Sequence, residues 1–96
     1  MRVVLALEAR EELREATQWY AERSAPVARR FVAAYRHARD LVAQSPERWP
    51  QLEGDIRRVG FSKFPYSLLY VVEQDRVLVL AVKHDRRRPG YWRGRE

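Results

Sequence analysis

The chain has 96 residues, of which 46% are hydrophobic and 33% charged, so it predicts one domain with a small core and excludes a disordered protein. It has no cysteine and only two histidines, His37 and His84, which excludes disulfides and thiolate metal sites and leaves too few ligands for a zinc cluster. No apolar stretch approaches the roughly 18 residues of a membrane span, and acidic residues come too early for a signal peptide. We therefore expect a cytoplasmic protein without a cofactor.

The excess of positive charge lies in the C-terminal part of the chain. Residues 57–96 contain ten Lys and Arg and four Asp and Glu, a net charge of +6, whereas residues 1–56 contain nine of each. This one-sided charge favours an anionic partner, which could be a nucleic acid, a ribosome or an acidic protein tail. Seventeen of the nineteen basic residues are Arg. Arginine is suited to bidentate contacts with phosphates or carboxylates, but a codon bias of the genome would give the same count without any function.

The first half of the chain predicts a strand followed by two helices. Residues 2–7 (RVVLAL) are short, apolar and rich in β-branched residues, as in a buried strand. Helical spacing then begins at Ala9, where the apolar residues of one face are Ala9, Leu13, Ala16 and Tyr20. The glutamates of this helix, Glu11, Glu12 and Glu15, favour its first turns through the helix dipole and need no other role. Pro26 ends this helix and opens a second one, capped by Ser24 or Ala25, that runs to about Ala43.

The second half predicts three strands. Residues 45–50 (SPERWP) end the second helix, because two prolines within them exclude regular structure. Strands are expected at residues 55–61, 66–73 and 76–83, with a bend at 62–65 and a hairpin turn at Gln74 and Asp75. The last two strands are apolar on both faces, so we expect the helices to cover one face and a partner chain the other. The predicted fold is a single α+β domain, β-α-α-β-β-β, with a mostly antiparallel sheet and a helical hairpin packed on one face.

Two blocks of this sequence resemble the RelE/ParE family of type II toxin-antitoxin toxins. The first is IRRVGFSKFPYSLLYVV at residues 56–72, and the second is VLAVKHDRRRPGYW at residues 79–92. The combination of FPY and LLY with AVKHDRR and PGYW is most similar to the ParE-type and plasmid-stabilisation members. The resemblance implies a RelE/ParE-like fold over residues 1–96 and a toxin that a cognate antitoxin binds and inactivates in a hetero-oligomer.

The branches of this family differ in their chemistry, and one residue favours the branch without catalysis. Nuclease members cleave mRNA on the ribosome without a metal, so they need cationic groups around the reacting phosphate and an acid or base. These members commonly carry Arg after the first tyrosine of the YxLxY strand, where this chain has Ser67. The resemblance therefore implies a ParE-type toxin that binds and inhibits DNA gyrase.

Two alternatives remain open at this stage. The first is a ribosome-dependent mRNA endonuclease, for which the resemblance implies the site residues Arg58, Arg86, Arg87 and Tyr91. His84 is a possible general base, but a lone histidine near a strand end is more often a surface or hydrogen-bonding residue. The second alternative is a degenerate member that only binds its antitoxin. In every case we expect the partner to contact charged and aromatic residues of the C-terminal part: Arg57, Tyr66, Tyr70, Arg88 and Trp92.

Overall fold

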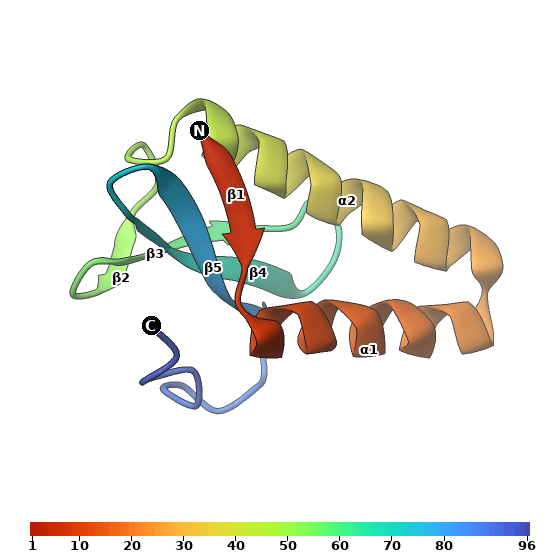
Figure 1. Cartoon of the computed structure of the whole chain (residues 1–96). Helices are drawn as coiled ribbons and strands as arrows, with labels where there is room; N and C mark the ends of the chain where they lie inside the picture. Colours follow the sequence, from red (N-terminus) through yellow and green to blue (C-terminus); the bar gives the residue numbers. More distant parts are fainter.

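The computed structural model describes residues 1–96 and contains a five-stranded sheet with two helices on one of its faces (Figure 1). In chain order the elements are β1 (Arg2–Leu5), α1 (Leu7–Arg23), α2 (Ala25–Gln44), β2 (Gln51–Glu53), β3 (Ile56–Gly60), β4 (Tyr66–Val72) and β5 (Arg76–His84). The sheet order is β1-β5-β4-β3-β2, in which only β1 and β5 are parallel. The predicted α+β class with a helical hairpin on a mostly antiparallel sheet is confirmed.

One strand and one helix boundary differ from the prediction. The sequence analysis missed β2, because its three residues are all exposed and therefore carry no alternation of apolar and polar side chains. The first helix begins at Leu7 rather than Ala9, and β1 ends at Leu5. The reason lies at Ala6, whose N–H still donates to Val79 O (2.9 Å) while its own carbonyl accepts the first helical bond from Arg10 N (3.0 Å).

The helical hairpin has the cap that the sequence predicts. Ser24 ends α1 by donating its N–H to Tyr20 O at 2.7 Å, and its hydroxyl accepts from Val27 N at 3.3 Å at the start of α2. Pro26 lies in the first turn of α2, where its missing N–H costs no helical hydrogen bond. A single residue therefore terminates one helix and begins the next, which makes the two helices antiparallel neighbours.

The main core lies between the helices and the sheet. It is built around Phe31 of α2, which packs against Tyr20, Phe61, Phe64 and Tyr66 with ring centroids 5.0 to 5.5 Å apart. Burying an aromatic or aliphatic side chain of this size stabilises the fold by roughly 1.5–3 kcal/mol. Neither helix is apolar enough along its length to cross a membrane.

The opposite face of the sheet is covered in part by the chain itself. A second cluster there contains Ile56, Leu69, Val71, Leu78, Leu80, Ala81 and Trp92. Trp92 belongs to the C-terminal segment (residues 85–96), which turns back past the end of β5 toward the start of α1 (Figure 1). Gly90 and Gly94, with φ of 84° and 83°, allow these turns. Trp92 therefore supplies part of the cover that we expected from a partner chain on this face.

Candidate functional site

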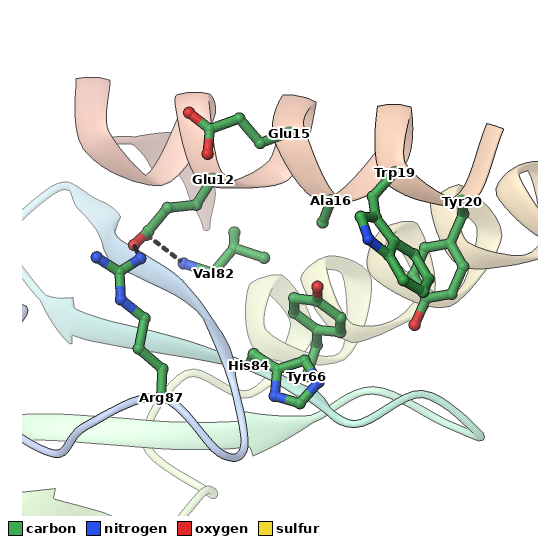
Figure 2. Close-up of a pocket in the computed structure, with 9 residues that line it drawn as sticks. All are labelled: Glu12, Glu15, Ala16, Trp19, Tyr20, Tyr66, Val82, His84 and Arg87. Carbon is green, nitrogen blue, oxygen red and sulfur yellow. Dashed lines mark hydrogen bonds and ion pairs between the residues drawn. The ribbon is translucent and has the colours of Figure 1, made fainter. Parts of the chain in front are cut away.

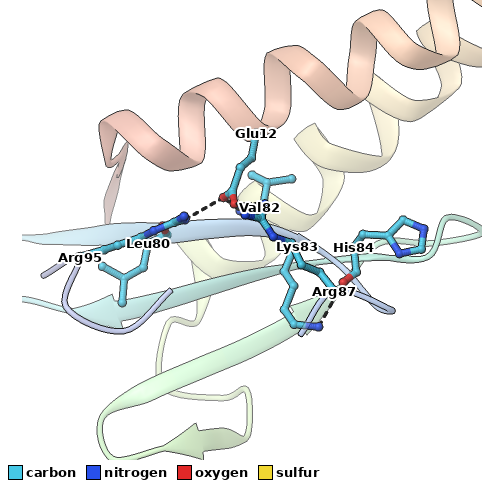
Figure 3. Close-up of polar contacts among 7 residues, drawn as sticks. All are labelled: Glu12, Leu80, Val82, Lys83, His84, Arg87 and Arg95. Carbon is cyan, nitrogen blue, oxygen red and sulfur yellow. Dashed lines mark hydrogen bonds and ion pairs between the residues drawn. The ribbon is translucent and has the colours of Figure 1, made fainter. Parts of the chain in front are cut away.

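A carboxylate from α1 holds the C-terminal segment against the edge of β5 (Figure 3). Because β1 has only four residues, the end of β5 lies beyond its reach and has no strand partner on that side. Glu12 Oε1 accepts hydrogen bonds from Val82 N (3.1 Å) and Arg95 Nη1 (2.9 Å), and Glu12 Oε2 accepts from Arg87 Nη1 (3.1 Å). Arg95 also donates to Leu80 O at 3.1 Å. Two side chains thus bind backbone groups that a neighbouring strand could otherwise use.

The role assigned to Glu12 from the sequence is therefore incomplete. Its side chain is only 10% exposed and joins three parts of the chain, so it does more than interact with the helix dipole. A signal for this exists in the sequence. Glu12 lies three residues after Ala9 and four before Ala16, on the buried face of the helix, where a carboxylate needs partners.

The candidates of the C-terminal segment have different environments. The Arg87 guanidinium lies over the Tyr91 ring, 3.7 Å from its centroid. Burial and the nearby Glu12 carboxylate raise the pKa of Tyr91 well above its usual value, and its buried hydroxyl has no hydrogen-bond partner of ordinary geometry. Arg86 and Arg88 are exposed, and neither side chain forms an ion pair.

Arg58 lies on the face of the sheet opposite the helices, in a cluster with Ser67, Lys83 and Asp85. Ser67 is buried between Gly60 of β3 and Lys83 of β5, and its hydroxyl donates to Asp85 Oδ1 at 3.4 Å. Arg58 Nη2 lies 3.8 Å from the same carboxylate oxygen. Beside this cluster is a hollow of about 210 Å³ whose lining includes Arg58 and Lys83. These are the cations nearest to the position at which the nuclease branch would carry its arginine.

The four residues that the nuclease alternative requires do not form one constellation. Arg58 interacts with Asp85, whereas Arg87 and Tyr91 interact with Glu12, and Arg58 and Arg87 line different hollows. A metal-independent cleavage needs its cations and its proton donor or acceptor around a single phosphate. This structure offers no such arrangement of these side chains.

A groove lined by aromatic residues lies between α1 and the edge of the sheet at which β4 starts and β5 ends (Figure 2). It has a volume of about 440 Å³, and its aromatic walls are Trp19 and Tyr20 from α1 together with Tyr66 and His84 from the sheet. Trp19 is 51% exposed, although the Arg23 guanidinium lies 3.7 Å from the centroid of its ring. The sequence analysis overlooked Trp19, because its neighbour Tyr20 accounted for the apolar face of the helix.

His84 lines this groove with its ring edge-on to Tyr66, at a centroid distance of 5.0 Å. Its Nδ1 accepts a hydrogen bond from Arg86 N at 3.0 Å, so one ring nitrogen stabilises the turn after β5. The hydrogen-bonding interpretation of this residue therefore has a specific partner in the structure.

The five residues expected to contact a partner are only partly accessible. Tyr70 is fully buried and donates its hydroxyl to Pro46 O at 2.7 Å, and Trp92 is buried against the sheet. Neither side chain can reach a partner unless the chain rearranges. Arg57 donates to two backbone carbonyls of the preceding loop, at 2.6 and 3.0 Å, while Tyr66 faces the groove and Arg88 is exposed.

Comparison with known proteins agrees with this fold. The family model described as the ParE toxin of the type II toxin-antitoxin system parDE matches residues 3–89. A solved structure described as the chromosomal ParDE TA system from P. aeruginosa has the same fold, with a TM-score of 0.76 and 16% identity over 88% of this chain and 95% of that chain. No curated protein matches the sequence. The match over residues 3–89 shows that the chain belongs to the ParE toxin family of type II toxin-antitoxin systems.

Proposed function

We propose that this protein is a toxin that acts by binding and inhibiting DNA gyrase, and that a cognate antitoxin neutralises it in a hetero-oligomer. The observation that carries the proposal is the buried Ser67 hydroxyl. It lies where a nuclease of the wider family would place an arginine, and Gly60, Lys83 and Asp85 enclose it. The chain thus lacks the charge that would stabilise a cleaved phosphate at this position.

The other candidate groups support the same conclusion. Arg58 and Arg87 each have a carboxylate partner, so each would have to give up an ion pair to bind a phosphate. The raised pKa of Tyr91 keeps its hydroxyl protonated at neutral pH, which is unsuitable for a general base. A toxin that acts by binding requires none of these groups to be catalytic.

The aromatic groove supports the proposed docking of an antitoxin segment. Trp, Tyr and Arg dominate the energetic centres of protein interfaces, and the groove brings Trp19, Tyr66 and Arg87 to one surface. The end of β5 beside it is closed by Glu12 and Arg95, so we propose the groove rather than the sheet edge as the docking site. Tyr66, Arg57 and Arg88 remain our proposed partner contacts, and we add Trp19 to them.

A ribosome-dependent mRNA endonuclease is the second candidate, and the hollow beside Arg58 and Lys83 is the observation that favours it.

The discriminating experiment uses the purified toxin in two assays, DNA supercoiling by gyrase and cleavage of an mRNA during its translation. We expect inhibition of supercoiling and no cleavage. If the mRNA is cleaved, and if Arg58→Ala and Tyr91→Phe each abolish this cleavage, the protein is a nuclease and our proposal is wrong. Activity in neither assay, with antitoxin binding intact, would identify a degenerate antitoxin-binding module.

The docking proposal is tested with the cognate antitoxin as the binding partner. Trp19→Ala should weaken its binding by about 2 kcal/mol or more, as truncation of an interface hot spot does. Leu7→Ala is the matched control, because Leu7 is also a large, exposed apolar residue of α1 but does not line the groove. Equal affinities of the two variants would contradict the assignment of the groove.

A further inference from the structure

The helical hairpin has a basic surface that is not apparent from the net charge of residues 1–56. Residues 25–44 contain four Arg and one Asp, a net charge of +3, whereas residues 7–23 contain three Arg and five Glu, a net charge of −2. The two helices nearly cancel in the sequence, but their charged side chains lie on different surfaces of the fold. Four basic or imidazole side chains of α2 are exposed: Arg29, Arg30, Arg36 and His37.

Two of these arginines border a hollow between the helices. The hollow has a volume of about 390 Å³ and is lined by Thr17, Ala28, Arg29, Val32 and Arg36. Arg29 and Arg36 form no ion pair with any carboxylate. They are seven residues apart in α2, which separates them by two turns, or about 10 Å along the helix axis.

More positive charge gathers at the neighbouring turn of α2. Tyr35 is buried there, and burial raises the pKa of its hydroxyl, while the charges of Arg39, Arg10 and Arg36 act in the opposite direction. Arginines from both helices therefore lie close enough to the Tyr35 hydroxyl to affect its ionisation. Of these three, only Arg39 has a carboxylate partner, Asp40 at 3.2 Å. Such a concentration of like charge favours binding of an anion.

The side chains of this surface favour one class of anionic partner over the others. We define the helical basic face as Arg10, Arg29 and Arg36. It has no exposed aromatic side chain on which an unpaired base could stack, since Tyr35 is buried, and this disfavours single-stranded nucleic acid. It also lacks the large apolar anchor that a protein interface needs, in contrast to the aromatic groove. A surface that has positive charges but no exposed aromatic or large apolar side chain is suited to the repeated phosphates of a duplex.

We propose that the helical basic face binds the phosphate backbone of duplex DNA, independently of sequence. The spacing of Arg29 and Arg36 corresponds to about three steps of the 3.4 Å axial rise between phosphates of one strand, so both can contact the same duplex. This binding is separate from the proposed inhibition of gyrase and from docking of the antitoxin, because it uses the outer side of the helices rather than the groove or the sheet.

The test measures binding of a fluorescent 20-base-pair duplex by anisotropy over a series of salt concentrations, with the full-length chain. The double variant Arg29→Ala/Arg36→Ala is compared with Arg2→Ala/Arg48→Ala, which removes the same charge from two exposed arginines without ion pairs elsewhere. Loss of two phosphate contacts should lower the slope of log K against log salt by about 1.8. The control should keep the slope of the wild type.

Three results would overturn the proposal. The first is the absence of duplex binding by the wild-type chain at low salt. The second is an equal loss of slope in both double variants, which would mean that only net charge matters. The third is tighter binding of single-stranded RNA or of polyglutamate than of the duplex, which would assign the face to another class of partner. Circular dichroism melting confirms that each variant is folded.

Discussion

Removal of the Glu12 carboxylate should destabilise the fold far more than removal of an exposed glutamate from the same helix. Glu12→Ala deletes the acceptor of Val82 N and leaves Arg95, whose side chain is only 14% exposed, without a carboxylate. Breaking a buried ion pair in this way costs roughly 3–5 kcal/mol. Two features reduce this cost, since Leu80 O still accepts from Arg95 and Arg87 is already 52% exposed. We therefore expect a loss of about 3 kcal/mol from a total of roughly 5–14 kcal/mol.

The assay is equilibrium unfolding in urea at neutral pH, with two further variants. Glu12→Gln keeps an oxygen for Val82 N but loses the charge, so its loss should be about half as large, near 1.5 kcal/mol. Glu11→Ala removes an exposed carboxylate that pairs only with Arg14, and its effect should stay below about 0.5 kcal/mol. The reasoning is refuted if Glu12→Ala costs less than about 1 kcal/mol, or no more than Glu11→Ala.

Three further substitutions test other parts of the fold. Burial raises the pKa of Tyr70 to about 12, so the stability that its protonated hydroxyl contributes is complete below pH 10 and is lost as the pH rises toward 12. Tyr70→Phe should therefore lose less of its free energy of unfolding between these pH values, as measured by urea titrations. Hydrogen bonds from Arg93 lower the pKa of Glu53 in the folded protein. The stability that this carboxylate contributes is present above its pKa in the unfolded chain and is lost as the pH falls through its pKa in the folded protein. The melting temperature of Glu53→Gln should therefore depend less on pH in the acid range. Ser67→Arg places a charge in a buried position and should lower the melting temperature by more than about 10 °C, whereas an unchanged value would mean that the site accommodates arginine.

The residues of the candidate site were predictable in kind but not in position. The sequence indicated that Arg58, Arg87 and Tyr91 are the groups a nuclease would need, but it could not indicate that Arg58 interacts with Asp85 while the other two interact with Glu12. These partners are 27, 75 and 79 residues away along the chain, and no local pattern encodes which carboxylate an arginine reaches. The backbone turns at Gly90 and Gly94 place the C-terminal segment, and only then is the pairing determined.

The sequence by itself determined the elements that depend on local chemistry. Short runs of apolar and β-branched residues specified β4 and β5, Ser24 with Pro26 specified the helical hairpin, and the residues around Tyr66 and Trp92 pointed to the toxin family. Only the tertiary structure decided what depends on distant contacts: the pairing of β2, the closure of the β5 edge by Glu12 and Arg95, and the aromatic groove. The physical reason is that helix caps and strand periodicity act over a few residues, whereas burial of Glu12 and assembly of the groove require elements brought together by packing of the whole core.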